Sequence, residues 1–416
     1  MDSIQIDGGI PLQGQVKIQG SKNAALPVLA ATILIKGKSR IENCPKIADV
    51  FQMQTLLESL GCKTAWEGAC FTVDASGVRE YRMPSQAVQS MRSSITLLGA
   101  LLARCGEAVL NFPGGCVIGA RPIDLHLSAL KELGVSFEEK EELLYAKAEC
   151  LTGGEIKLSF PSVGATENAL LAAVLAKGDT RIYPAAKEPE VVALCNFLQK
   201  AGAQVEGIGT NRLHIRGVKA LREVSFRIPA DRIVAGTYLT GCMMTGGSIF
   251  LEDAPTLQLQ ATLAAAERMG VSFQENADGL FVQAPKRLHT PGELVTAVYP
   301  GFPTDMQSPF LAALTIAEGD SILTETIFEN RFHIVEPLRQ MGAQLRQEGR
   351  RVFVKGVLGL QGTTVQAEEL RGGAALVMAG LAAEGHTRVN GCGYIYRGYE
   401  NIGRDLRELG ARVYSI

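Results

Sequence analysis

Residues 169–215 read ALLAAVLAKGDTRIYPAAKEPEVVALCNFLQKAGAQVEGIGTNRLHI and contain most of one structural unit. The hydrophobic pattern predicts, in chain order, a small-residue apolar helix, a short β-branched strand, a second helix and two alternating strands. Their expected ranges are 169–176, 180–182, 191–200, 204–207 and 212–215. Each helix is followed by a glycine, Gly178 or Gly202, which can adopt the left-handed conformation that ends a helix.

The same two glycine stops recur six times along the chain. The later stop of each unit follows an apolar residue, and its positions are separated by 73, 68, 68, 72 and 68 residues: Gly61, Gly134, Gly202, Gly270, Gly342 and Gly410. The earlier stop closes a more apolar helix, at Gly37, Gly106, Gly178, Gly247, Gly319 and Gly385. This spacing predicts six βαβαββ-like units.

A unit of this size cannot bury both faces of its helices alone, so the units must stack. Three units per domain is the natural division, and charged, irregular sequence near residues 218–231 separates the third unit from the fourth. Residues 4–18 precede the first unit and are expected to complete the last one, which would build one domain from both chain ends. Repeats alone are as compatible with a scaffold as with an enzyme.

Composition describes a globular protein without a strong electrostatic field. Of 416 residues, 46% are hydrophobic and 20% charged, which excludes a disordered chain, a coiled coil or a fibre. Lys and Arg (41) nearly balance Asp and Glu (43), so no nucleic-acid or membrane partner is expected. The longest apolar run, residues 24–35, is too short to span a bilayer, and no basic leader precedes an apolar segment, so the protein is expected to be cytoplasmic.

Nine cysteines without a close pair and five scattered histidines argue against a disulfide framework and against a metal site. Cys116 is the one cysteine for which the sequence predicts a reactive and not only a structural role. It lies in residues 111–122, a loop rich in glycine and proline, with Arg121 nearby to favour the thiolate. The alternative, a small buried apolar cysteine, is retained for the other eight.

The predicted N-termini of two helices carry polar residues that could bind an anion or transfer a proton. In GSKNAA, Ser21 or Asn23 can cap the helix while Lys22 adds a charge, so phosphate or carboxylate could bind, although a lone lysine is usually only solvated. In FPTDMQ, Thr304 and Gln307 form a capping-box pattern that would make Asp305 a first-turn acid. The sharper hypothesis makes Asp305 a general base, but its position alone favours the cap.

Arginines recur where units join or helices begin. Their planar guanidinium groups suit bidentate binding of phosphate and carboxylate, and several at corresponding openings indicate a pocket for a ligand with more than one negative group. The residues are Arg92, Arg121, Arg331, Arg371 and Arg397.

Six motifs together resemble the UDP-N-acetylglucosamine 1-carboxyvinyltransferases, the MurA family of enolpyruvyl transferases. The motifs run in order from the first residues to the last: GSKNAALP (20–27), PGGCVIGARPIDLH (113–126), SVGATENALLAA (162–173), FPTDMQ (302–307), TIFENRF (326–332) and YRGYENI (396–402). The related shikimate-pathway transferases share the sixfold repeat but lack the cysteine loop.

The resemblance implies two inside-out α/β barrels that close over the substrates, with three repeats in each. One would comprise residues 21–229, with the cysteine loop at 112–122, and the other residues 1–20 and 230–416. The family reaction moves the enolpyruvyl group of phosphoenolpyruvate to the 3′-hydroxyl of UDP-N-acetylglucosamine through a tetrahedral intermediate and releases phosphate. This is the first committed step of peptidoglycan synthesis and the target of fosfomycin. It needs neither a metal nor a redox cofactor.

The resemblance also implies residue roles. Cys116 matches the cysteine that forms an adduct with phosphoenolpyruvate and donates a proton, and Asp305 matches the carboxylate proposed to deprotonate the sugar hydroxyl. The phosphoenolpyruvate site would consist of Lys22, Asn23, Arg121 and Arg397, with Lys22 and Arg397 also acting in catalysis. The UDP-sugar contacts would be Arg92, Arg121, Pro122, Ile123, Asp124, Leu125, Ser162, Val163, Gly164, Asp305 and Ile327.

Two positions depart from the family pattern. Ala48 stands where the family commonly has lysine, which removes a positive charge, and Glu369 stands where it commonly has aspartate. A weak or silent paralogue that binds the UDP-sugar is therefore one alternative, and a shikimate-type transferase is the other. The protein is expected to act on its two substrates as a monomer or a weak oligomer.

Overall fold

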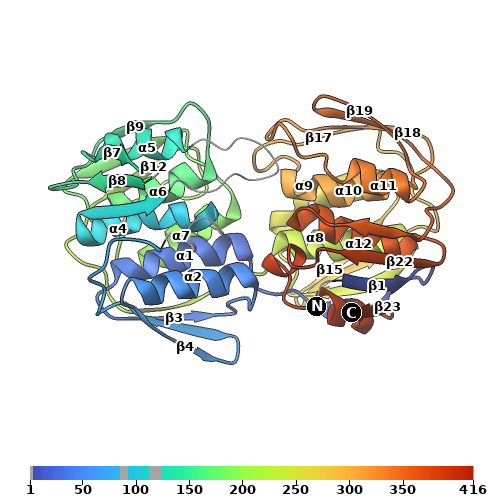
Figure 1. The fold of residues 1–416 in the computed structure, drawn as a ribbon, viewed down its shortest axis with the longest axis horizontal. Helices are drawn as coiled ribbons and strands as arrows, with labels where there is room; N and C mark the ends of the chain where they lie inside the picture. Colours follow the sequence, from blue (N-terminus) through green and yellow to red (C-terminus); the bar gives the residue numbers. More distant parts are fainter. Residues whose placement is uncertain (1–2, 85–91, 112–122, 142, 416) are drawn as a thin grey trace. The chain divides into compact units, whose positions relative to one another are not determined.

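The computed structural model describes residues 3–84, 92–111, 123–141 and 143–415. The chain divides into two compact units (Figure 1). The inserted unit takes the described residues between 20 and 229, and the terminal unit takes residues 3–19 and 230–415. The chain crosses from one unit to the other at 19/20 and 229/230, beside the expected boundaries at 20/21 and 229/230.

The elements of each unit follow one order of helices and strands. In the inserted unit they are α1 (Lys22–Ala31), η1 (Thr32–Leu34), β3 (Lys38–Glu42), α2 (Ala48–Ser59), β4 (Lys63–Glu67), β5 (Cys70–Asp74), η2 (Arg92–Thr96), α4 (Leu97–Cys105), β6 (Glu107–Asn111), α5 (Asp124–Lys131), β7 (Ser136–Lys140), β8 (Leu143–Lys147), β9 (Glu155–Lys157), α6 (Val163–Ala173), β10 (Asp179–Tyr183), α7 (Pro189–Lys200), β11 (Gln204–Glu206), β12 (Leu213–Arg216) and β13 (Val224–Arg227).

The terminal unit begins with two strands from the start of the chain. Its elements are β1 (Ser3–Asp7), β2 (Gln13–Lys17), α8 (Arg232–Thr245), β14 (Ser248–Glu252), α9 (Thr256–Arg268), β15 (Ser272–Asn276), β16 (Gly279–Gln283), β17 (Glu293–Val295), η3 (Thr304–Met306), α10 (Gln307–Leu314), β18 (Asp320–Thr324), α11 (Val335–Gln340), β19 (Gln344–Glu348), β20 (Arg351–Lys355), β21 (Thr364–Gln366), α12 (Leu370–Ala382), β22 (His386–Asn390), η4 (Ile395–Arg397), α13 (Ile402–Glu408) and β23 (Arg412–Ser415).

The predicted repeat is confirmed, and β9 to β12 show it in full. These strands form a sheet in the order β11-β12-β10-β9, with β9 parallel to β10 and the other neighbours antiparallel. Helix α6 connects the two parallel strands. It begins six residues before the expected 169–176 helix. The apolar pattern did not reveal this earlier start, because the first turns of the helix contain buried polar side chains. Thr166 is one of them, and its hydroxyl donates to the carbonyl of Ser162.

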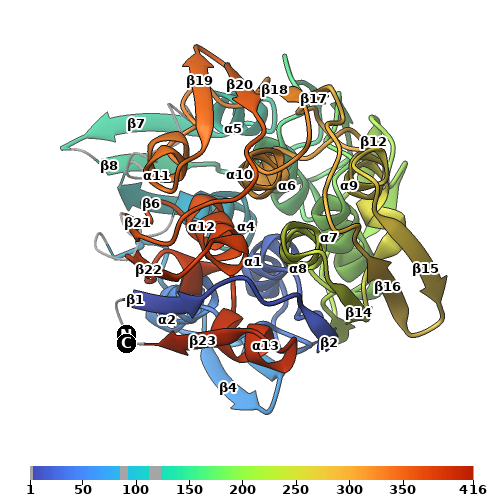
Figure 2. The same ribbon diagram turned by 90° about the vertical axis from the view of Figure 1, so that its right-hand side faces the viewer.

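Strands from distant parts of the chain complete several sheets. The last strand of the inserted unit, β13, pairs in parallel with β3 of the first repeat, and β2 pairs in parallel with β14 of the fourth. Strand β1 lies between β22 and β23 and is antiparallel to both, so the first part of the 4–18 segment completes the last repeat, as expected (Figure 2). For its second part, β2, the expectation is wrong, because β2 belongs to the sheet of the fourth repeat. In the second repeat, a single parallel bridge between Arg82 and Val109 occupies the place of the leading strand.

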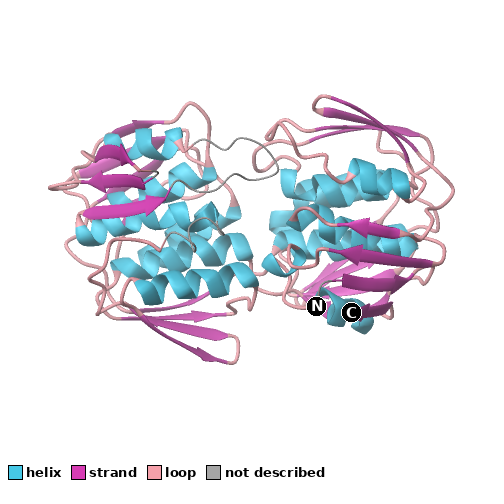
Figure 3. Ribbon diagram, in the orientation of Figure 1, coloured by secondary structure: helices cyan, strands magenta, loops and turns pink. Residues whose placement is uncertain are grey.

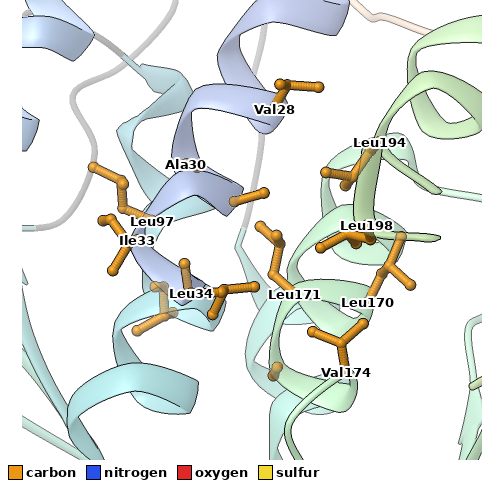
Figure 4. Packing of buried hydrophobic residues seen from close by; sticks show 14 of the residues in the cluster. Val28, Ala30, Ile33, Leu34, Leu97, Leu170, Leu171, Val174, Leu194 and Leu198 are labelled. Carbon is orange, nitrogen blue, oxygen red and sulfur yellow. The ribbon is translucent and has the colours of Figure 1, made fainter. Parts of the chain in front are cut away.

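Helices fill the interior of each unit and strands form its outer layer (Figure 3). The interior helices are α1, α4 and α6 in one unit and α8, α10 and α12 in the other, and nearly all their residues are buried. In the inserted unit, side chains such as Val28, Leu171 and Leu198 pack between α1, α6 and α7 (Figure 4). No helix in the described part of the chain is long and apolar enough to span a membrane.

The later glycine of every repeat has the predicted left-handed backbone, with φ between 83° and 106°. The earlier glycine has it in four repeats only. Gly37 and Gly247 have no positive φ, and Gly246 (φ 63°) ends α8 in place of Gly247. Gly247 instead lies against the backbone of Leu12, where a Cβ atom would come within 2.3 Å of the carbonyl oxygen. Close backbone approach, not helix termination, requires glycine there.

Gly342 offers a test of the left-handed stops. It has φ 92° and space around the position of a Cβ atom, so Gly342→Ala changes only the backbone preference. We expect a loss of about 1 kcal/mol in the free energy of unfolding, measured by urea denaturation. Gly359→Ala is the matched control, because Gly359 is exposed, has similar space and has no positive φ. Equal effects of the two substitutions would contradict the assignment.

Candidate active site

The start of α1 holds the predicted lysine in a buried ion pair. Ser21 caps the helix, with its Oγ accepting a hydrogen bond from the N–H of Ala24 at 3.3 Å. Lys22 is the first helical residue, and its Nζ lies 2.8 Å from Oδ2 of Asp49 in the first turn of α2. Asp49 is buried, and its carboxylate fixes the direction of the Lys22 side chain. Asn23 follows in the same turn, and Ala48 begins α2.

Two of the predicted UDP-sugar segments meet in the inserted unit. Ser162 caps α6, and Val163 and Gly164 form its first turn, where free backbone N–H groups suit an anion. Ile123, Asp124 and Leu125 open α5.

His126 and Asn168 join these two helices. Nδ1 of His126 lies 2.7 Å from Nδ2 of Asn168, and the imidazole ring packs so closely on Gly164 that a Cβ atom there would approach it within 2.8 Å. Buried Asn168 also bonds the backbone of Gly99 and Ile95, which ties α6 to α4 and η2. Sequence reasoning missed this junction, although both residues lie inside the quoted motifs.

In the terminal unit, Asp305 lies between two buried guanidinium groups. Its Oδ1 accepts a hydrogen bond from Nη2 of Arg331 at 2.7 Å. Its Oδ2 accepts two from Arg371, from Nη2 at 3.0 Å and from Nε at 3.2 Å. Both arginine side chains are almost fully buried, at 2% and 3% exposure, whereas a quarter of Asp305 is exposed.

The charges around Asp305 determine its protonation state. Burial alone would raise the pKa of this carboxyl, but Arg371 and then Arg331 outweigh burial and hold the pKa well below its ordinary value. Arg232, which begins α8, acts in the same direction. Asp305 is therefore a carboxylate throughout the physiological pH range.

Three interior helices of the terminal unit present their starts to this cluster. Asp305 lies in η3, which leads directly into α10, Arg371 lies in the first turn of α12, and Arg232 begins α8. Glu369 caps α12 by accepting hydrogen bonds from the N–H groups of Arg371 and Gly372. Glu369, which stands where the family commonly has aspartate, thus stabilises the start of the helix that carries Arg371.

The predicted capping box at Thr304 and Gln307 is wrong. Thr304 begins the 3₁₀-helix η3, and its hydroxyl donates to Oε2 of Glu325 at 2.8 Å instead of accepting a backbone N–H. Gln307 is fully buried and accepts a hydrogen bond from the hydroxyl of Ser308. A buried carboxylate 21 residues away competes successfully for the threonine.

The remaining predicted residues divide between the two units. Ile327 and Arg397 belong to the terminal unit with Asp305, and Arg397 ends η4. Arg92 begins η2 in the inserted unit. Cys116, Arg121 and Pro122 lie outside the described residues.

Comparison with known proteins identifies the family. A model described as EPSP synthase (3-phosphoshikimate 1-carboxyvinyltransferase) matches residues 6–406. The UDP-N-acetylglucosamine 1-carboxyvinyltransferase 2 of Caldanaerobacter subterraneus subsp. tengcongensis is 47% identical over 416 residues, covering all of both chains. The UDP-N-acetylglucosamine 1-carboxyvinyltransferase 1 of Halalkalibacterium halodurans is 44% identical, covering 100% of this chain and 95% of its own. The chain belongs to the UDP-N-acetylglucosamine 1-carboxyvinyltransferases.

Solved structures of other enolpyruvyl transferases are also similar to this member of the UDP-N-acetylglucosamine 1-carboxyvinyltransferase family. The enolpyruvyl transferase NikO from Streptomyces tendae has a TM-score of 0.89 and 26% identity and covers 99% of this chain and 98% of its own. An EPSP synthase from Acinetobacter baumannii, 16% identical over the full length of both chains with a TM-score of 0.75, shares the fold. The two-domain α/β fold is thus common to the wider group of enolpyruvyl transferases.

Replacing Asp305 tests the buried cluster. Asp305→Asn leaves Arg331 and Arg371 without their carboxylate, and we expect a loss of about 3 kcal/mol in the free energy of unfolding at pH 7. Because the folded-state pKa of Asp305 is depressed, its contribution is present above the unfolded pKa, about 3.9, and is lost as the pH falls below it.

The measurement is urea denaturation between pH 3 and pH 7. The difference between wild type and variant should stay constant down to about pH 4 and shrink below it. Asp320→Asn, at an exposed position of the same unit, is the control. An equal difference for both variants, or one that grows on acidification, would contradict the cluster's role.

Proposed function

We propose that this chain transfers the enolpyruvyl group of phosphoenolpyruvate to the 3′-hydroxyl of UDP-N-acetylglucosamine and releases phosphate, the first committed step of peptidoglycan synthesis. The observation that carries the proposal is the 44–47% identity, over the full chain, to relatives bearing the name of this activity. The solved EPSP synthases, at 16–17% identity, support a shikimate-type activity much less well.

Asp305 is proposed to receive the proton of the attacking sugar hydroxyl. The group is ionised, as a base must be, but its depressed pKa makes it a weak one. It therefore takes the proton late, as the bond from the sugar oxygen to C2 of the enolpyruvyl group forms and the hydroxyl becomes strongly acidic. Before that point it orients the hydroxyl as a hydrogen-bond acceptor.

Cys116 is proposed to deliver the matching proton to the methylene carbon of phosphoenolpyruvate. Addition of a proton to C3 and of the sugar oxygen to C2 yields a tetrahedral intermediate that still carries its phosphate. Loss of a proton from C3 and of phosphate from C2 then restores the double bond on the sugar ether. Acid and base must therefore each act in both directions.

Fixed cations are proposed to hold the anionic groups of the substrates. Lys22, whose direction Asp49 sets, would bind phosphoenolpyruvate together with Asn23, Arg121 and Arg397. For the UDP-sugar, the start of α6, which Ser162 caps, offers the backbone N–H groups of Val163 and Gly164 to an anion, which supports the assignment. The other contacts would come from Arg92, Pro122, Ile123, Asp124, Leu125 and Ile327. A cytoplasmic location and a monomeric or weakly oligomeric state stay predictions.

Phosphate release tests the proposal directly. Purified protein mixed with phosphoenolpyruvate and UDP-N-acetylglucosamine should release one phosphate per enolpyruvyl sugar formed, and shikimate 3-phosphate should not replace the sugar nucleotide. Folded protein that binds the UDP-sugar without turnover would support the silent-paralogue alternative instead. Phosphate release with phosphoenolpyruvate and shikimate 3-phosphate, but not with UDP-N-acetylglucosamine, would favour the shikimate-type alternative.

Fosfomycin tests the proposed thiol. The epoxide should add one equivalent to the wild-type protein, detected by intact-mass spectrometry, because a reactive thiolate opens the ring. Cys116→Asp should remain unlabelled, whereas Cys150→Asp should be labelled like the wild type, since Cys150 is an exposed cysteine without an assigned role. Persistent labelling of the Cys116 variant would refute the assignment.

A further inference from the structure

Glu325 is a buried carboxylate to which sequence reasoning assigned no role. It follows β18 and is 1% exposed. Side-chain hydroxyls and backbone N–H groups from three separate segments donate to it. The donors are Thr296 Oγ1 at 2.9 Å, Thr304 Oγ1 at 2.8 Å, Ile327 N at 2.7 Å and Phe328 N at 3.1 Å. Four hydrogen bonds offset the cost of burying the group.

The two oxygens of Glu325 serve different segments. Oε1 accepts from Thr296 and from the backbone N–H groups of Ile327 and Phe328, which fixes the turn after β18. Thr326 reinforces that turn, with its hydroxyl donating to the carbonyl of Thr296 at 2.6 Å. The backbone at Ile327, a predicted contact to the UDP-sugar, is therefore held by one oxygen.

The other oxygen leads to Asp305. Oε2 accepts from the hydroxyl of Thr304, and the same hydroxyl accepts from Nη1 of Arg331 at 2.8 Å. Nη2 of Arg331 then donates to Oδ1 of Asp305 at 2.7 Å. Because the Thr304 proton is committed to Glu325, its lone pair faces Arg331, and this contact anchors the guanidinium group of Arg331 beside Asp305.

We propose that Glu325 is a positioning residue of the transfer reaction, which orients Asp305 through Thr304 and Arg331 and fixes the backbone of Ile327 directly. This inference rests on the proposed function. One buried carboxylate thereby sets both the group that receives the proton and the turn that contacts the sugar nucleotide.

The chemistry of the site separates the two effects. In Glu325→Gln, the amide oxygen can keep the three bonds of Oε1, but the amide nitrogen in place of Oε2 donates and cannot accept from Thr304. The threonine would then receive two donors and lose the partner of its own proton, so only the connection to Arg331 is disturbed. Thr304→Val removes that connection from the other side, and Thr304→Ser keeps it.

Steady-state kinetics from pH 5 to pH 9 test the inference. E325Q and T304V should each lower kcat about tenfold while changing the KM for UDP-N-acetylglucosamine less than about twofold, and T304S should restore most of kcat. Over this pH range the shape of the kcat/KM profile should stay that of the wild type, because a loosened Arg331 lets the pKa of Asp305 rise only toward its ordinary value, which lies below pH 5. Wild-type kcat in T304V, or equal losses in T304V and T304S, would overturn the proposal.

Amide hydrogen exchange keeps the inference separate from the proposed function. The Ile327 and Phe328 amides should exchange at wild-type rates in E325Q and at least tenfold faster in E325A, because only the second variant removes the acceptor. Equal exchange in E325A and wild type would overturn the positioning role whether or not the protein turns over. Absence of phosphate release from the wild type, with the expected exchange pattern, would overturn the proposed function alone.

Discussion

The packing of helices against helices inside each unit is the constraint on which the rest of the structure depends. A βαβαββ repeat has one sheet and two helices and cannot cover both faces of its inner helix, so three repeats must share an interior. Those inner helices meet closely enough that glycine is needed at contact points. A Cβ atom on Gly99 would lie 2.2 Å from the carbonyl of Asn168, and one on Gly236 would lie 2.7 Å from Met306. Small residues are therefore common in α8 and α12.

This packing also decides where chemistry can occur. A helix buried along its length can meet a ligand only at its ends, and the N-terminal end provides free N–H groups and a positive dipole. In the terminal unit, Arg232, Asp305 and Arg371 all lie at such starts and influence one another. In the inserted unit, Lys22 and Ser162 occupy the equivalent positions on α1 and α6. The repeated scaffold thus places a possible site at the start of each interior helix. The residue found at each helix start decides what that site can bind or do.

Several residues of the candidate site were predictable from the sequence, but their connections and Glu325 were not. The sequence pattern singled out Asp305, Arg331 and Arg371 separately, since each lies at a helix opening or a junction of repeats. Their ion pairs join positions 26 and 66 residues apart, which no local pattern specifies. The capping-box prediction failed for the same reason: it weighed only Thr304 and its immediate neighbours, whereas Glu325 competes for the hydroxyl from the turn after β18.

The six repeats, the order of their helices and strands, and the left-handed glycine after each second helix can all be predicted from the amino-acid pattern, because these features depend on hydrophobic periodicity and backbone preference within short windows. Folding in three dimensions settled that β2 joins the fourth repeat and that Gly247 serves close approach to Leu12. Hydrogen bonds between strands and the pairing of buried charges are contacts between residues far apart in the chain. Their partners exist only once the helices have packed.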